Sequence, residues 1–185
     1  MQRVSGGWVY LTVGVIIGLI SAVAAVDSIG ASAVRPGSIW QSWDTSPTAR
    51  LHPYAIAHYL LGGRLPPAAG QMRELAAERD RDGGVISSGC TYTVTGRPGA
   101  RAWWSLAASA GGSSAPSIAG MLTSDSAILD SDGSLTVTVS RAPQPGNWIR
   151  PPERSNFVLL FMVAGETGLS QRDQLPDLLV KRSSC

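Results

Sequence analysis

Residues 132–140 read Asp-Gly-Ser-Leu-Thr-Val-Thr-Val-Ser. Within this stretch Leu135, Val137 and Val139 alternate with polar residues, a period of two that is typical of a β-strand with one buried face. The Asp-Gly pair that precedes them favours a tight turn. The stretch therefore predicts a half-buried strand that begins at a turn.

Three further segments predict strands by similar reasoning. Thr91 to Thr95 alternates in the same way, and residues 101–109 are another candidate. Residues 156–164 contain an uninterrupted apolar run, which predicts burial on both faces. Gly and Pro breakers separate the segments, and no strand-helix-strand rhythm follows residue 85. We therefore expect a mainly β fold, an antiparallel β-sandwich of jelly-roll-like form.

The composition fits one turn-rich domain. The chain has 185 residues, of which 44% are hydrophobic, and this is enough for a single core. Its 15 basic and 13 acidic residues give a formal charge of +2, so there is no basic stripe for phosphates to follow. We therefore expect no nucleic-acid partner.

An uncharged segment near the N-terminus predicts a membrane helix. Residues 7–26 carry no charge and are long enough to span the hydrocarbon layer as one helix or uncleaved signal anchor. Arg3 precedes the segment and Asp27 follows it, so the positive-inside rule places residues 1–6 in the cytoplasm. We expect a single-pass protein that contacts the lipid of the bacterial inner membrane, with a β-sandwich domain of residues 47–185 in the periplasm.

Two alternatives concern this apolar segment. Ala22-Val23-Ala24 and Ala31-Ser32-Ala33 both look like small-residue cleavage sites, so a cleaved signal peptide is the competing interpretation. Gly14 and Gly18 form a Gly-x-x-x-Gly pair, the spacing that lets two membrane helices pack closely into a homodimer. Glycine is also common in membrane helices without a partner, and this simpler interpretation is favoured.

The segment that follows predicts a linker and then a short helix. Residues 27–46 are rich in Ser, Gly, Ala and Pro, which favours a linker, and Trp40 and Trp43 within it are expected to dock on the domain. Pro53 then favours the start of a helix, and the Gly pair at 62–63 favours its end.

The chain has two cysteines, far apart in sequence. Thiols pair in an oxidising compartment where geometry allows, so we expect a disulfide between Cys90 and Cys185 that ties the end of the chain to the domain. The alternative is a nucleophilic Cys90, which needs a nearby cation or base. The disulfide is the favoured interpretation.

Aspartates occur twice in the pattern Asp-x-Asp-Gly, first as Asp80 and Asp82 and then as Asp130 and Asp132. Such oxygens are suited to open a Ca²⁺ loop, but the further ligands and the closing Glu of an EF-hand are missing. Aspartate also caps turns through its own side chain, and this interpretation is favoured.

Other catalytic or metal-binding signatures are missing from the sequence. His52 and His58 are six positions apart, so they do not share a helical face as the His pair of a His-Glu-x-x-His zinc motif does. The chain also lacks a Gly-x-Ser-x-Gly elbow and a phosphate-binding loop. We therefore expect no catalytic residues, no metal and no cofactor.

Aromatic side chains are the better binding candidates, because an exposed ring can stack on a sugar or pack against a partner. Trp103 and Trp104 are adjacent in an expected strand, so one should point into the core and the other outward. Trp104 and Trp148, together with the four aspartates, are the candidate binding residues.

Several motifs of residues 50–185 together form a recognisable set. In order they are His52-Pro53-Tyr54, Asp80-Arg81-Asp82-Gly83, Cys90-Thr91-Tyr92, Trp103-Trp104-Ser105-Leu106, Asp132-Gly133-Ser134-Leu135-Thr136, Pro145-Gly146-Asn147-Trp148 and Cys185. This set resembles the short, membrane-anchored members of domain of unknown function 1214, an exported bacterial family. The resemblance implies an antiparallel β-sandwich. It also implies that residues 71–79 form a strand, although their composition favours a helix.

The resemblance brings no established reaction, and the chain departs from the family pattern. Ser109-Ala110 stands where the family usually has Tyr-Asp, and Met162 and Ala164 stand where it usually has Arg and Tyr. The replaced groups are polar ones suited to line a pocket. An enzyme is therefore less expected here than in a longer relative.

We expect a noncatalytic envelope protein that acts as a binding or structural module for a glycan or protein partner. One alternative is a hydrolase or transferase that uses the loop aspartates, and it requires two of them to converge in a pocket. Another is an accessory subunit of a membrane protein complex, which predicts that Trp40, Trp43 and the face of Gly14 and Gly18 are buried against a second chain.

Overall fold

The structure is a computed structural model of the chain. It describes residues 5–29, 31–33, 37–43, 53–68, 71–98, 103–110, 117–153, 156–164 and 177–185, and the side chains of the first helix from Gly7 to Val26. Residues 1–4 of the expected cytoplasmic segment, residues 44–46 of the expected linker, and His52 lie outside the described residues.

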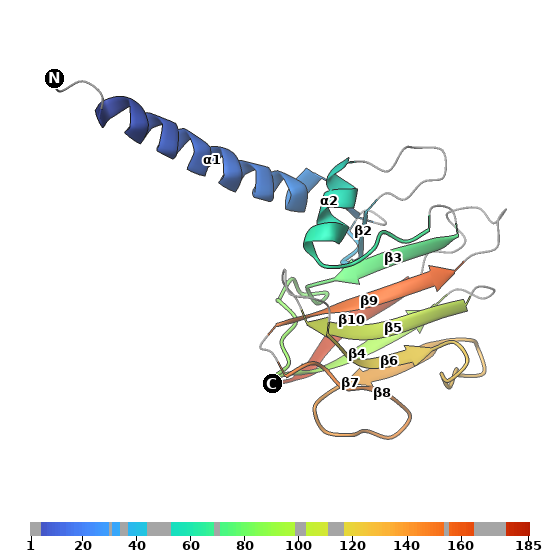
Figure 1. The fold of residues 1–185 in the computed structure, drawn as a ribbon. Coiled ribbons are helices and arrows are strands. Elements are labelled where there is room, and N and C mark those ends of the chain that lie inside the picture. Colours follow the sequence, from blue (N-terminus) through green and yellow to red (C-terminus); the bar gives the residue numbers. More distant parts are fainter. Residues whose placement is uncertain are drawn as a thin grey trace.

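The described part of the chain is two β-sheets, a short helix that covers one of them, and a long helix that projects from the domain (Figure 1). The elements are α1 (Ser5–Ile29), β1 (Ala31–Ala33), β2 (Gln41–Trp43), α2 (Pro53–Leu61), β3 (Met72–Ala77), β4 (Thr91–Arg97), β5 (Trp103–Ala110), β6 (Ile118–Thr123), β7 (Leu135–Val139), β8 (Asn147–Ile149), β9 (Phe157–Ala164) and β10 (Asp177–Ser184). The prediction of a mainly β fold with an N-terminal apolar helix and a short second helix is confirmed.

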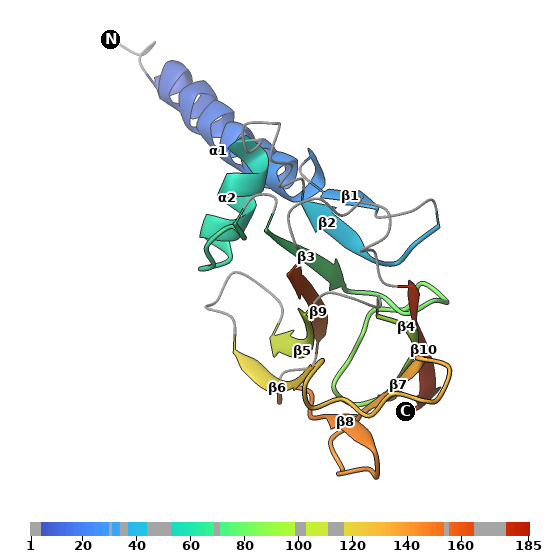
Figure 2. The same cartoon turned by 90° about the vertical axis from the view of Figure 1, so that its right-hand side faces the viewer.

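The two sheets face each other (Figure 2). One has the strand order β1-β2-β3-β9-β5-β6 and the other the order β10-β4-β7-β8. All described pairs are antiparallel except β7 with β8, which run parallel. This parallel pair was not predicted.

The alternating segments form strands because their apolar residues meet in the core between the sheets. Val94 of β4 pairs with Val137 of β7, and both are fully buried, whereas Thr136 beside them is exposed. Leu106 of β5 and Phe161 of β9 face them from the other sheet in the same apolar cluster. Burial of one face of each strand is the main force that joins the two sheets.

Strand β9 has one fully buried face, and its outer face is only partly covered, because Leu160 is buried there but Val158, Met162 and Ala164 are half-buried, so the predicted burial on both faces is only partly met. It lies between β3 and β5 in the larger sheet. Phe161 enters the core between the sheets, while Leu160 packs under α2 in a second apolar cluster. The domain therefore has three layers, with α2 on the outer face of the larger sheet.

Strand β3 confirms the family expectation over the local helix preference. Residues Met72–Ala77 pair with β9 in continuous register, and Leu75 and Ala77 are fully buried. A helix in this position cannot hydrogen-bond to the exposed edge of β9. Tertiary pairing therefore outweighs the intrinsic propensity of these residues.

The described parts of the expected linker, residues 27–29, 31–33 and 37–43, contain regular structure. Helix α1 continues to Ile29, and β1 and β2 then pair with each other and with β3. Trp40 and Trp43 are buried, which confirms their expected docking, and the Trp40 Nε1–H donates to the Leu178 carbonyl at 2.8 Å. Both rings are buried within their own domain, so the signature expected for a complex subunit is not observed for them.

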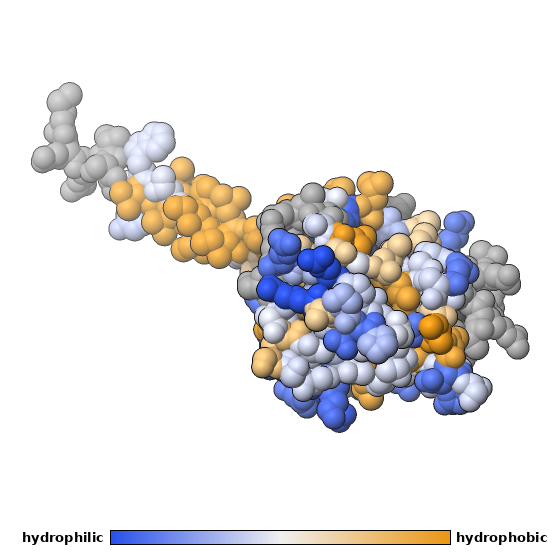
Figure 3. Space-filling view, turned by 90° about the horizontal axis from the view of Figure 1, so that it is seen from below, coloured by the Kyte–Doolittle hydropathy of each residue, from blue (hydrophilic) through white to orange (hydrophobic). Residues whose placement is uncertain are grey.

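Helix α1 is long and apolar enough to cross a membrane, over Gly7–Val26. None of that span is buried inside the structure, and it projects from the domain as an almost continuous apolar surface (Figure 3). A signal sequence near the N-terminus meets the same criteria. Gly14 and Gly18 face open space, so the homodimer through this helix stays a prediction.

Candidate functional site

The two Asp-x-Asp-Gly motifs fold into the same kind of turn. The Asp80 backbone N–H donates to the Gly84 carbonyl at 2.8 Å, and the Asp130 N–H donates to the Ser134 carbonyl at 2.9 Å. Side chains reinforce both turns, because Asp80 Oδ1 accepts from the Gly84 N–H at 2.8 Å and Asp132 Oδ1 accepts from the Ser134 N–H at 3.0 Å. The repeated motif is therefore a repeated turn, the favoured interpretation of the sequence.

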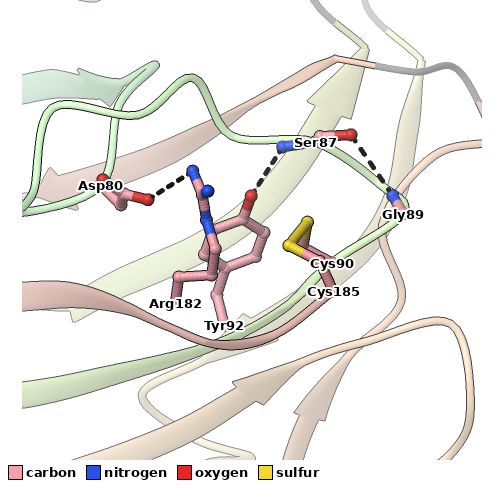
Figure 4. Close-up of a disulfide and its surroundings, with 7 residues drawn as sticks. All are labelled: Asp80, Ser87, Gly89, Cys90, Tyr92, Arg182 and Cys185. Atoms are coloured by element: carbon pink, nitrogen blue, oxygen red, sulfur yellow. Dashed lines mark hydrogen bonds and ion pairs between the residues drawn. A yellow bond between two sulfur atoms is a disulfide. The ribbon is translucent and has the colours of Figure 1, made fainter.

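Asp80 is buried, with 1% of its surface exposed, and holds the last strand to this turn (Figure 4). Its Oδ2 pairs with Nη2 of Arg182 on β10 at 2.7 Å. The Arg182 guanidinium also lies 5.9 Å from the centre of the Tyr92 ring, whose hydroxyl accepts from the Ser87 N–H at 2.9 Å. All these contacts are internal to the fold, so Asp80 acts as a structural residue.

The other three aspartates are exposed, and Asp130 and Asp132 share one partner, the Ser134 hydroxyl, at 3.1 and 2.7 Å. Asp82 lies 4.0 Å from Arg81, and Asp132 lies 3.8 Å from Arg97. The hydrogen bond from Ser134 lowers the pKa of Asp132, so this carboxyl stays ionised. Within the described ranges, no three His, Cys, Asp or Glu side chains are placed to hold a metal ion. The structure therefore does not bring Asp80, Asp82, Asp130 and Asp132 together.

The tryptophan pair of β5 points to opposite faces, as predicted. Trp104 is only 2% exposed and stacks on Phe161 at 5.8 Å, so its ring is part of the core and cannot receive a ligand. Trp103 is the outward member, 42% exposed, and its Nε1–H donates to Asp125 at 3.0 Å. Trp104 is therefore removed from the binding candidates.

The half-buried Trp148 donates through Nε1–H to the Ser140 carbonyl at 2.9 Å.

The structure brings the two cysteines to disulfide distance, with 2.03 Å between the sulfurs (Figure 4). Cys90 lies just before β4, and Cys185 just after β10, which pairs with β4. The strand pairing and the sulfur bond therefore hold the same two segments together. With both sulfurs bonded, Cys90 has no free thiol to act as a nucleophile.

The structure adds a set of side chains that the sequence did not indicate, and it begins at the end of α2. The Arg64 N–H donates to the Tyr59 carbonyl at 2.8 Å, and the Gly63 N–H donates to the Leu60 carbonyl at 3.0 Å. These bonds, with Gly63 at φ +65°, form a Schellman cap. The cap places the Arg64 guanidinium 5.4 Å from the centre of the Tyr59 ring.

Arg64 is thereby directed at the outer face of the larger sheet, where it forms an ion pair with Glu74 of β3. Its Nη2 also lies 3.4 Å from Nε2 of His58. The His58 ring stacks on Trp43 of β2 at 3.8 Å, with 12° between the planes. We call these five residues, Trp43, His58, Tyr59, Arg64 and Glu74, the α2 polar cluster.

The α2 polar cluster is unusual because three of its members, Trp43, Tyr59 and Glu74, are buried, while His58 and Arg64 are half-buried. Trp43 and Tyr59 are buried, and in the described region the Trp43 Nε1 and the Tyr59 hydroxyl are buried without a hydrogen-bond partner. Burial also raises the pKa of Tyr59, and the nearby Glu74 raises it further. An unpaired buried polar group costs about 1–3 kcal/mol. The cluster therefore has hydrogen-bonding capacity that the fold does not use, and it is the candidate functional site.

Burial also raises the pKa of Glu74, and the Arg64 guanidinium opposes this effect only in part. The folded protein therefore holds the Glu74 proton more tightly than the unfolded chain does. The stabilisation from protonated Glu74 is complete below the ordinary carboxyl pKa, and it is lost as the pH rises through the raised value.

We expect the variant Glu74→Gln to keep its free energy of unfolding where the wild-type protein loses stability with rising pH, because glutamine has no proton to release. In urea unfolding between about pH 4 and about pH 7, the wild-type protein should lose stability relative to Glu74→Gln as the pH rises. The exposed Glu153→Gln variant makes the same change of charge and should follow the wild-type protein. If the free energies of unfolding of the wild-type protein and of Glu74→Gln change in parallel with pH, the raised pKa of Glu74 is contradicted.

The outer face next to the cluster is where this chain departs from the family pattern. Met162 lies between Glu74 and Ser105 in the strand register, and Ala164 lies between Met72 and Trp103. Ser109 shares this face, since it pairs with the outward Val158. The departures thus leave small or apolar side chains beside a polar cluster.

Sequence reasoning missed the α2 polar cluster for a physical reason. Arg64 and Glu74 lie ten positions apart, on either side of a double proline, and neither belongs to a known motif. The available signals were the Gly pair that caps α2 and a charged Glu74 directly before the apolar run of residues 75–77. His58 was considered only as a metal ligand, whereas it stacks on Trp43.

Comparison with known proteins identifies the family. Residues 71–165, slightly more than half of the chain, match the family described as Protein of unknown function (DUF1214). The chain belongs to this family, so the family inferred from the motifs is confirmed, while its placement among the membrane-anchored members stays a prediction. The curated proteins include no match to it.

Two solved structures are similar to parts of this chain. The VPA0106 protein from Vibrio parahaemolyticus is 18% identical with a TM-score of 0.52, and the match covers 71% of this chain and 35% of that protein. An uncharacterized protein from Burkholderia cenocepacia is 26% identical with a TM-score of 0.47, over 61% of this chain and 29% of that protein. The chain thus matches about a third of the length of each protein.

Proposed function

We propose that this protein is a membrane-anchored, noncatalytic envelope protein. Residues 7–26 hold it in the bacterial inner membrane, and its β-sandwich lies in the periplasm. The observation that carries the proposal is α1, whose apolar span is unburied and has no face shielded by the domain. A long apolar helix exposed on all sides is stable in lipid and costly in water.

The cysteine pair supports the periplasmic location. The two cysteines lie at bonding distance, next to the ends of the paired strands β4 and β10. Disulfides persist in oxidising compartments and are rare in the cytosol. The positive-inside rule, with Arg3 before the span and Asp27 after it, favours the same orientation.

The polar side chains of the domain support a binding or structural role. The carboxylates of the Asp-x-Asp-Gly motifs are used in turns and in the Asp80–Arg182 pair. Asp130 and Asp132 both lie within hydrogen-bond distance of the Ser134 hydroxyl, but they do so on an exposed turn, as turn-stabilising contacts. Trp103 is the aromatic side chain best placed to meet a glycan or protein partner. It is exposed on the same sheet face as Ile118 and Met121, and this face extends to the α2 polar cluster.

Membrane fractionation combined with thiol labelling tests this proposal. The full-length protein should stay in the membrane pellet after alkaline carbonate extraction. A maleimide reagent should label neither cysteine until the denatured protein is reduced. Release by carbonate, a mature N-terminus after Ala24, or labelling of both cysteines without reduction contradicts it.

A further inference from the structure

An exposed apolar face lies beside the end of α1. Leu60, Leu61 and Leu65 expose 59%, 56% and 84% of their surface. They belong to the end of α2 and to the loop after its cap, whereas Ala55 and Tyr59 of the same helix are buried against the sheet. We call these three residues the leucine face. Large apolar side chains grouped on a domain surface mark an interaction site.

The position of α1 identifies what covers this face. Cα atoms of α2 come within 8 Å of Cα atoms of α1, and Figure 1 shows α2 next to the C-terminal end of the long helix. The apolar span ends at Val26, and Trp40 is already anchored on β10. This short tether keeps the α2 side of the domain near the plane in which the span leaves the lipid.

The charges around the leucine face agree with a lipid surface. Residues 53–68 contain no Asp or Glu. Arg64, which separates Leu61 from Leu65, turns its guanidinium inward to Glu74 and so does not place a charge on this face. Tyr54 is also partly exposed, and tyrosine is a side chain that favours the boundary between lipid and water.

We infer that the leucine face inserts into the outer leaflet of the same bilayer that α1 spans, so that the domain rests on the membrane rather than moving freely on its tether. This inference rests on the proposed anchor. It adds a second lipid contact, in which a short helix lies in the interface with its apolar side toward the acyl chains. The α2 polar cluster then lies directly behind a lipid-bound helix.

Spin labelling of the full-length protein in lipid nanodiscs tests the inference. Nitroxide labels are attached to Leu61→Cys and, separately, Leu65→Cys. Both sites are exposed, so the label does not disturb the core. Each label should collide more often with oxygen, which concentrates in lipid, than with a water-soluble nickel complex. Bromolipid quenching of a fluorophore at the same cysteines should give the same depth order.

Two control sites separate this inference from the proposed function. A label at Val15→Cys, in the middle of the apolar span, reports whether α1 is in lipid. A label at Ile128→Cys, an exposed site in the segment between β6 and β7, should report water, since Figure 1 shows both strands on the part of the domain away from α1. If Val15 is in lipid but Leu61 and Leu65 favour nickel, the inference is wrong and the anchor stands. If both leucine labels are shielded from oxygen and nickel alike, a protein covers the face and the inference is wrong. If Val15 itself favours nickel, the anchor and the inference both fail.

Discussion

Replacement of both cysteines by serine is expected to lower the free energy of unfolding by about 4–5 kcal/mol. The bond between Cys90 and Cys185 closes a loop with a sequence separation of 95, and the chain-entropy model gives roughly this value for a loop of that length. The physical reason is that the cross-link removes many conformations of the unfolded chain. Urea unfolding of the domain in detergent, followed by circular dichroism, measures the change.

The chemistry of the cross-link supplies the control. Wild-type protein treated with a reductant should lose as much stability as the double variant, and the reductant should have no further effect on that variant. Each single variant should match the double variant, because either change removes the same bond. Full stability of the wild-type protein after verified reduction contradicts the prediction.

Gly96→Ala should be the most disruptive single substitution in the sheets. Gly96 lies in β4 between Leu178 of β10 and Leu135 of β7, at φ +139°. A Cβ atom there would lie 1.8 Å from the carbonyl oxygen of Asp177. The clash is with backbone, so relief requires strand β10 to separate from β4. The expected loss is about 3–5 kcal/mol, from backbone strain and overpacking together.

Gly133→Ala is the matched control for Gly96→Ala. Gly133 also has a positive φ, +77°, but a Cβ atom there would meet nothing within 4 Å. Only the left-handed backbone cost of about 1–2 kcal/mol should remain. The same urea unfolding experiment compares the two variants. Equal losses contradict the close approach of β10 to Gly96.

Strands could be predicted from the sequence where burial of one face alone determines the pattern of apolar residues. In β7 and β4 the apolar residues alternate because one face of each strand is buried, so the pattern alone identifies them. β3 has no such pattern, and its composition favours a helix. It is a strand because its neighbour β9 needs a partner on that edge, and only the family resemblance indicated this.

The candidate site was harder to predict because it depends on how a helix docks on a sheet. Trp103 and Trp104 are neighbours of the same residue type, so the sequence does not show which of them faces the core. The way β5 presents its two faces to the rest of the fold decides that Trp104 is the buried one. The α2 polar cluster similarly requires the cap at Gly63 to direct Arg64 toward Glu74. Periodicity describes single elements, whereas these contacts join elements from distant parts of the chain.

The side of the membrane on which the domain lies is tested most directly by labelling one introduced cysteine in intact spheroplasts. Ile128→Cys is exposed on the domain, and Gln2→Cys precedes the apolar span. With a membrane-impermeant maleimide, we predict that Ile128→Cys is labelled before lysis and Gln2→Cys only after it. Labelling of Ile128→Cys only after lysis places the domain in the cytoplasm and contradicts the account.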